Sequence, residues 1–275
     1  MAGAPGDPLP TLYIPHGGGP CFFMDWNPPH TWDKLAAWLG KLGESIARPK
    51  AVVVISGHWE ADAYSATGNP HPPLIYDYYG FPEHTYRIQY PAPGDPELAQ
   101  EITDLLRSKG ISARVDPSRG FDHGVFIPFK VIYPDAGVPI VQLSLKAGLD
   151  PTTHIELGRA LAPLRRQGVL IVGSGMSFHN LREFGLDPNP ESDRFDAWLT
   201  DAACTPDPGE RSAKLAQWQK APGARRAHPR EEHLIPLMVA AGAAGEDAGS
   251  KIFHDRIMGA TISAFGFGMP SDLIS

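Results

Sequence analysis

Residues 51–60 read AVVVISGHWE and combine the pattern of a buried strand with a histidine. The run Ala51–Ile55 is continuously apolar and mostly β-branched, which is typical of a strand covered on both faces in an α/β sheet. We expect the strand to stop at Ser56-Gly57, so that His58 lies at the carboxyl end of a central strand. Open α/β sheets bind their ligands at that edge. His58 is therefore a candidate site residue, and the common alternative is a histidine that only hydrogen-bonds a neighbouring loop.

The pattern of a strand followed by glycine and histidine occurs at two more places. The apolar run Leu12–Ile14 leads into a proline, His16 and three glycines. The run Val169–Val172 leads into Gly-Ser-Gly and then His179. Glycines allow the backbone to approach a ligand closely. We therefore expect His16, His58 and His179 to contribute to one site.

Two further histidines join this group through their surroundings. His123 lies in a glycine-flanked segment that we expect to be a loop, and His233 stands beside Glu231 and Glu232 at the start of a predicted helix. A set of independent core histidines would be an improbable coincidence. A divalent metal bound by histidine and carboxylate groups, with spare histidines for proton transfer, accounts for the whole set.

The composition is that of a globular protein without a strongly charged surface. The chain has 275 residues, 42% of them hydrophobic, and a net charge of -7. Because it has no dense run of lysine and arginine, we expect neither nucleic acid nor an anionic membrane as a partner. Cys21 and Cys204 are too few for a cysteine-built zinc site. Residues 1–10 lack the features of a signal peptide, and no apolar run approaches the ~20 residues of a membrane span, so we expect a cytoplasmic protein.

The remaining pattern alternates helices and strands. We expect helices over Thr31–Ala47 and Asp95–Lys109 and around His154–Arg165, strands at Ile111–Val115 and Val138–Leu145, and a few more helices between 185 and 228. His154 is interpreted as a surface or interface residue. These elements predict a single α/β domain over residues 1–275, with a central, largely parallel or mixed sheet flanked by helices. The active site is expected at the carboxyl ends of the strands.

Two other glycine-rich interpretations are weaker. Residues 16–19, His-Gly-Gly-Gly, resemble the oxyanion loop of lipases and esterases, but those enzymes also need a serine in a Gly-x-Ser-x-Gly turn. The segment 175–179 comes nearest to such a turn, and its last residue is His179. Nucleotide binding is disfavoured, because the segment after Val172 fits neither Gly-x-Gly-x-x-Gly nor a P-loop.

The segment from Gly68 to Pro96 is rich in proline, glycine and tyrosine. Long irregular segments on a rigid scaffold often form the rim of an active site. Its aromatic residues either line a pocket for an aromatic substrate or only hold the loop against the body: Tyr76, Tyr78, Tyr79, Phe81 and Tyr86. For any single one of them we favour the second role.

The motifs resemble those of a known enzyme family when they are taken together and in order. They are PHGGGP at 15–20, SGHWE at 56–60, QYPAPG at 89–94, DHG at 122–124, GSG at 173–175 with His179-Asn180, and HPREEH at 228–233. In this combination the chain resembles the class III extradiol ring-cleavage dioxygenases, and it is most similar to the 4,5-DOPA dioxygenase branch of the LigB superfamily. The resemblance extends from about Leu12 to about Phe267.

The resemblance implies a role for each histidine of the group. His16, His58 and His233 would bind the metal, and His179 would act on the substrate as an acid-base group or serve as an additional ligand. His123 would line the oxygen or substrate side. In the protocatechuate-cleaving relatives the third ligand is a glutamate, so Glu231 or Glu232 in place of His233 is the alternative.

The resemblance also implies the reaction. A non-haem Fe(II) would serve in the insertion of both atoms of O2 into a catechol-type substrate, which gives a semialdehyde. The same ligands would also suit Zn(II), and a zinc-dependent metallohydrolase is the alternative function. A non-enzymatic relative that binds a protein partner is a third class, against which the retained histidines speak. We expect a homodimer.

Overall fold

A central eight-stranded sheet organises the computed structural model, which describes residues 7–185 and 187–270. The order across the sheet is β4-β3-β5-β2-β6-β1-β8-β7. The strands are β1 Thr11–Pro15, β2 Ala51–Ala61, β3 Tyr64–Thr67, β4 Ala113–Asp116, β5 Ile140–Lys146, β6 Val169–Gly175, β7 Gly249–Ile257 and β8 Ala260–Phe267. The predicted α/β class with a mixed sheet is confirmed.

The four central strands β5, β2, β6 and β1 are parallel, and the two sides of the sheet contain antiparallel pairs. On one side β8 pairs antiparallel with β1 and β7 with β8, while on the other side β3 pairs antiparallel with β5. The central strands have apolar runs because both of their faces are buried. Residues Val52–Ile55 of β2, for example, are completely inaccessible to solvent. Parallel alignment places the carboxyl ends of β1, β2 and β6 at one edge of the sheet.

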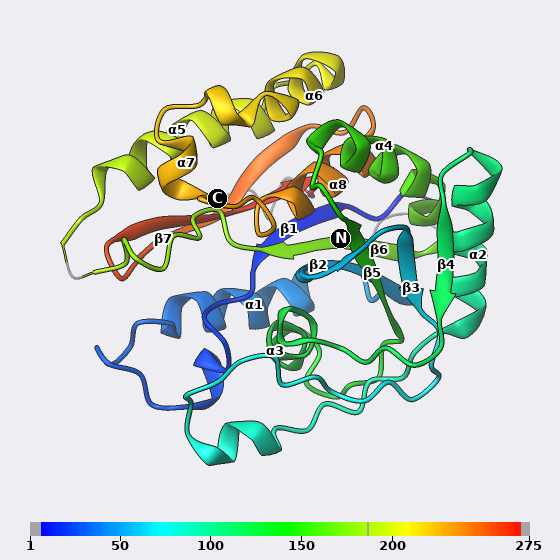
Figure 1. Cartoon of the computed structure of the whole chain (residues 1–275), viewed down its shortest axis with the longest axis horizontal. Helices are drawn as coiled ribbons and strands as arrows, with labels where there is room; N and C mark the ends of the chain where they lie inside the picture. Colours follow the sequence, from blue (N-terminus) through cyan, green and yellow to red (C-terminus); the bar gives the residue numbers. More distant parts are fainter. Residues whose placement is uncertain (1–6, 186, 271–275) are drawn as a thin grey trace.

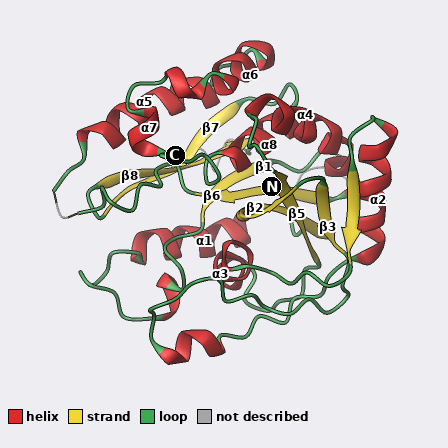
Figure 2. Ribbon diagram, viewed as in Figure 1, coloured by secondary structure: helices red, strands yellow, loops and turns green. Residues whose placement is uncertain are grey.

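Helices cover both faces of this sheet, as Figures 1 and 2 show. The helices α1 and α3 lie on one face, below the sheet in Figure 1, and α4 and α8 pack on the other. The α-helices are α1 Asp33–Ser45, α2 Pro96–Ser108, α3 His123–Ile132, α4 Pro151–Leu161, α5 Pro190–Ala203, α6 Pro208–Ala216, α7 Ala224–Ala227 and α8 Ile235–Ala244. Short 3-10 helices are η1 Cys21–Phe23, η2 Glu83–Arg87, η3 Ala162–Gln167 and η4 Trp218–Lys220.

Local sequence signals explain where several helices begin and which side they bury. Asp95 caps α2 by accepting a hydrogen bond from the backbone N–H of Leu98 at 2.9 Å, and Pro96 occupies the first helical position. Every residue of α8 is buried, because this helix lies between the sheet and α4. Within the described residues, none of the helices combines the length and the apolar character that a membrane span requires.

Some of the predicted elements need correction. Strand β2 does not stop at Ser56-Gly57 but continues to Ala61, with a register irregularity against β5 between Ile55 and Glu60. The hairpin of β7 and β8 was not predicted. His154 is completely buried rather than a surface residue: its Nδ1 donates to the Asp150 carbonyl at 2.7 Å, and its Nε2 accepts from the Lys146 N–H at 3.1 Å.

Candidate active site

The five histidines of the predicted group come from five separate segments of the chain. His16 directly follows β1, and its backbone N–H donates to the carbonyl of Gly175 at the end of β6, at 3.1 Å. His58 lies in the part of β2 where the register against β5 is irregular, between Ile55 and Glu60. His179 follows β6 by four residues. His123 is the first residue of α3 rather than a loop residue, and His233 lies in the turn before α8, which begins at Ile235 rather than at Glu231.

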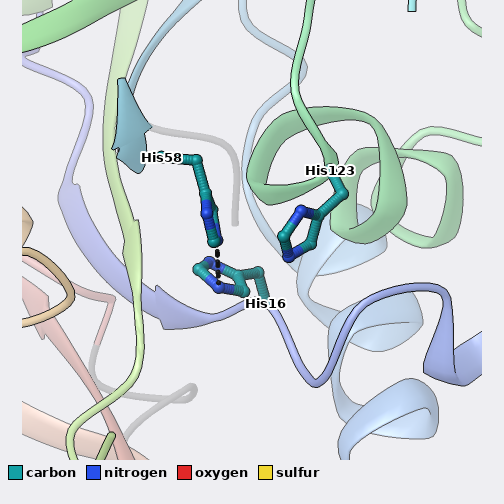
Figure 3. Close-up of side chains that lie close together, drawn as sticks. All are labelled: His16, His58 and His123. Atoms are coloured by element: carbon teal, nitrogen blue, oxygen red, sulfur yellow. Dashed lines mark hydrogen bonds between the residues drawn. The ribbon is translucent and has the colours of Figure 1, made fainter. Parts of the chain in front are cut away.

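Three ring nitrogens converge on one point between these elements. The Nε2 atom of His58 is 3.2 Å from Nε2 of His16 and 3.2 Å from Nε2 of His233. Figure 3 shows His16 and His58 facing each other, with His123 beside them. The three rings come from segments up to 217 positions apart in sequence, from residue 16 to residue 233, and the parallel sheet brings them together.

The opposite nitrogen of each of these three rings has a protein partner. Nδ1 of His16 is 3.1 Å from the hydroxyl of Ser174, which donates its own hydrogen to the carbonyl of Gly124 and so accepts from His16. Nδ1 of His233 is 3.0 Å from a carboxylate oxygen of Glu232, and Nδ1 of His58 is 3.5 Å from one of Asp77. A proton on Nδ1 of each ring, beside these oxygens, would leave the Nε2 atoms with lone pairs that can bind a metal.

Burial keeps these rings neutral. Burial and then the neighbouring histidines lower the pKa of His16 and of His233 well below the usual range. Burial, followed by the charge of His123, lowers the pKa of His58 to about 3. Neutral imidazoles with aligned lone pairs are the form in which histidine binds metals.

The spacing of the converging atoms suits one metal ion. Imidazole nitrogens bind zinc at about 2.0–2.1 Å, so two ligands of one tetrahedral ion lie roughly 3.4 Å apart. The observed separations of 3.2 Å are close to this value. His16, His58 and His123 also offer one ligand atom each within 4.8 Å of one another, and so do His179, Glu232 and His233. His16, His58 and His233 are therefore one of the sets of side chains in this cluster that could hold a divalent cation.

His123 and His179 lie beside this set. The ring of His123 is 4.0 Å from that of His58, and its Nδ1 donates to the carboxylate of Asp77 at 2.7 Å. The ring of His179 stacks on His233 with centroids 3.4 Å apart, and its Nδ1 is 3.3 Å from Glu232. Each of these two rings therefore contacts one histidine of the set and one carboxylate.

The two glutamates before His233 differ in position. Glu231 pairs with Arg225 at 2.6 Å. Glu232 contacts Nδ1 of both His233 and His179 through the same oxygen. Burial raises the pKa of Glu232, but the hydrogen bond from His179 and the nearby positive charges outweigh it and lower the pKa. Glu232 is thus placed to hold two rings as an ionised carboxylate.

Two residues of the site have no counterpart in the sequence prediction. Asp77, in the loop between β3 and α2, contacts both His58 and His123. Burial raises the pKa of its carboxyl, but the hydrogen bonds and charges of His123, with the charge of His58, outweigh it and lower the pKa to about 2. Ser174 orients His16. The only sequence signal for Asp77 is its place in the loop that we expected at the rim of the site.

The tyrosines around Asp77 mainly hold this loop together. The hydroxyl of Tyr76 donates to the carbonyl of Ile88, and that of Tyr78 to the carbonyl of Thr85, each at 2.6 Å. Tyr78 is also edge-on to His123, with ring centroids 5.7 Å apart. Tyr79 is 90% exposed. The first two residues therefore have the structural role that we favoured for them.

Close backbone contacts bring β2 and β6 against the turn that carries His233. A β-carbon on Gly57 would lie 2.9 Å from the carbonyl oxygen of Glu232, and one on Gly175 would overlap that of His233. The same His233 carbonyl accepts hydrogen bonds from the hydroxyl of Tyr13 at 2.7 Å and from the N–H of Met176 at 3.2 Å. The position of His233 therefore depends on the absence of a side chain at Gly175.

Replacing Gly175 by alanine is expected to lower the free energy of unfolding by about 1–3 kcal/mol, because the new methyl group must push the backbone of His233 away. Thermal or denaturant unfolding measures the loss. Gly40→Ala on α1 is the matched control, since a β-carbon there meets no atom within 4 Å. If Gly175→Ala is as stable as the wild type, the backbone of His233 does not lie as close to Gly175 as the structure indicates.

Known proteins of similar sequence and structure identify the family. The family described as the catalytic LigB subunit of aromatic ring-opening dioxygenase matches residues 10–269. The 4,5-DOPA dioxygenase extradiol of Beta vulgaris is 40% identical over 92% of this chain and 93% of its own length. The dioxygenase tasH of Hapsidospora irregularis is 40% identical over 94% of this chain and 85% of its own.

Relatives from Escherichia coli K12 agree in both sequence and structure. Its 4,5-DOPA dioxygenase extradiol is 35% identical over 86% of this chain and 85% of its own length. The crystal structure of an uncharacterized protein from the same organism superposes with a TM-score of 0.76 at 30% identity, and the match covers 94% of this chain and all of that one. The eight-stranded sheet, the histidine cluster and these matches together show that the chain belongs to the LigB family of aromatic ring-opening dioxygenases.

Proposed function

We propose that this dioxygenase is an extradiol enzyme that inserts both atoms of O2 into a catechol-type substrate and yields a semialdehyde, with Fe(II) held by His16, His58 and His233. The observation that carries the proposal is the convergence of three Nε2 atoms at 3.2 Å spacings, while each opposite Nδ1 is engaged by the protein. The relatives named above as 4,5-DOPA dioxygenases support a catechol as the substrate class. The zinc hydrolase has no comparable support.

The ligand set determines what the metal contributes. His16, His58 and His233 would hold the ion, and an Fe(II) bound by only three protein ligands would be able to bind a catechol and O2 as well. His16 and His233 are almost completely buried, with exposed fractions of 1% and 3%. The protein therefore holds both rings in place before substrate arrives. His58 is partly accessible, which leaves the site open on its side.

His179 is proposed to move the substrate proton. Glu232 accepts from its Nδ1, so Nε2 has the lone pair needed to take a proton from a catechol hydroxyl. Its stacking on His233 keeps the ring beside the proposed ligands. His123 lies against His58 on another side of the site, where its Nε2 is proposed to face the oxygen or the substrate.

Protein stripped of metal and reloaded anaerobically with Fe(II) is expected to cleave a catechol, whereas protein loaded with Zn(II) is not. The physical reason is that an iron ion held by these residues would supply redox chemistry for the reaction with O2, which Zn(II) cannot supply. O2 uptake and the appearance of a yellow ring-fission product measure the outcome over a panel of catechols that includes DOPA.

Equal product formation with Zn(II), or in the absence of O2, would rule out the dioxygenase reaction. A chain that takes up no O2 with any catechol of the panel, and instead hydrolyses an ester or amide panel with Zn(II) bound, would favour the hydrolase. The cytoplasmic location and the homodimer stay predictions.

A further inference from the structure

Asp77 contacts two histidines of the site with one carboxylate. Its Oδ1 accepts hydrogen bonds from the backbone N–H of His123 at 2.9 Å and from Nδ1 of the same residue at 2.7 Å. Its Oδ2 is 3.5 Å from Nδ1 of His58. One carboxylate therefore lies between a proposed metal ligand and a proposed substrate-side histidine, whose rings are 4.0 Å apart.

The loop around Asp77 is itself held in place. The N–H of Ile75 donates to the carbonyl of Phe121 at 2.8 Å, and Leu74 forms an isolated bridge with Phe121, two residues before His123. The N–H of Asp77 donates to the carbonyl of Ile75 at 3.0 Å. This pairing fixes the position of the carboxylate relative to the start of α3.

Glu232 holds the other side of the site in the same way. Its Oε1 atom contacts Nδ1 of His233 at 3.0 Å and Nδ1 of His179 at 3.3 Å. Each carboxylate thus joins one proposed ligand to one proposed proton-transfer or substrate-side histidine. A partner of this kind fixes the tautomer and orientation of a metal-binding imidazole and raises its basicity.

We infer that Asp77 is a positioning residue that holds His58 and His123 in the tautomer that presents Nε2 to the metal and substrate. This inference rests on the proposed metal site. The competing explanation is that Asp77 serves only as a cap for α3, because Asp122, the residue before the helix, makes no side-chain cap bond and Asp77 accepts from the first N–H of the helix.

Asp77→Asn separates the two roles. The side-chain oxygen of the asparagine can still accept hydrogen bonds from the backbone N–H and Nδ1 of His123. The cap of α3 therefore remains, because asparagine and aspartate cap helices about equally well. Its amide group would turn an N–H toward Nδ1 of His58. His58 then keeps a favourable contact only by moving its proton to Nε2, which removes the lone pair that a metal needs.

We expect Asp77→Asn to weaken Zn(II) binding by roughly 10–100-fold, the usual effect of losing the partner of a metal-binding histidine. A competing chelator measures the dissociation constant, and nitrogen NMR of the metal-free protein reports whether the proton of His58 sits on Nδ1 or Nε2. The matched control is Asp95→Asn, because Asp95 caps α2 with the same change of charge and lies in another element. The control should bind Zn(II) like the wild type.

A second variant guards against a folding defect. Asp77→Ser is smaller, cannot clash, and keeps a hydroxyl suited to capping, so it should weaken Zn(II) binding while its thermal midpoint stays near that of Asp95→Ser. If both Asp77 variants bind Zn(II) as tightly as the wild type and the proton of His58 stays on Nδ1, the inference is overturned. Asp77 would then serve only as a cap of α3. If the wild-type chain itself binds no Zn(II), the proposed metal site fails instead.

Discussion

Replacing His16 or His58 by alanine is expected to abolish metal binding. Each substitution removes one of the three Nε2 atoms proposed to bind the metal, and the two histidines that remain would hold a divalent cation far more weakly. The loss of affinity should exceed the roughly 10–100-fold change that follows the loss of a residue outside the ligand set. Metal content per chain after dialysis measures the effect, and activity should fall with it.

His123→Ala and His254→Ala provide the comparison. His123 lies against His58 and is proposed to face the oxygen or the substrate rather than to bind the metal, so its loss should leave the metal bound. His254 is exposed on β7, outside the cluster, and controls for the removal of a histidine as such. If His123→Ala loses the metal while the chain with His233→Ala keeps it, the ligand set is His16, His58 and His123, and our assignment is wrong.

The central part of the fold can be predicted from sequence because it carries its own local signal. Strands β2 and β6 are buried on both faces, so their β-branched runs stand out. The hairpin of β7 and β8 has no such signal: β7 alternates buried and exposed residues irregularly, and β8 contains small residues and a glycine. The helical start predicted at Glu231 was wrong because those residues form a turn that the histidine cluster needs.

Some residues of the candidate site can likewise be predicted from local sequence patterns, and others cannot. His16, His58 and His179 follow strand signals, and a parallel sheet brings the ends of its strands together whatever the rest of the chain does. Asp77 reaches His58 and His123 because Ile75, in a loop without helix or strand, pairs with Phe121, which lies 46 positions further along the chain. No local pattern encodes such a contact. His154 was misjudged for a related reason, since its burial depends on how α4 packs against α8 and the sheet.

Replacing His179 by glutamine is expected to lower turnover by roughly 10²–10⁴-fold while metal content and catechol affinity stay near the wild-type values, the usual contribution of a positioned acid-base group. Glutamine keeps much of the size of the ring and can still approach Glu232, but it cannot take up a proton at neutral pH. Iron per chain, catechol affinity and the single-turnover rate on this variant measure the three quantities separately.

The three measurements distinguish three roles for His179. If it is an additional ligand, metal content should fall together with activity, since its ring lies directly on that of His233. If its ring only stabilises the loop after β6, the variant should lose some stability and turn over at a near-normal rate per folded molecule. That loop is already tied down without the imidazole, because the backbone N–H of His179 donates to the carbonyl of Ala227 at 2.9 Å and the side chain of Asn180 donates to the carbonyl of Arg226 at 2.8 Å. The loss should therefore appear in turnover, and a near-normal rate would refute the proton-transfer role.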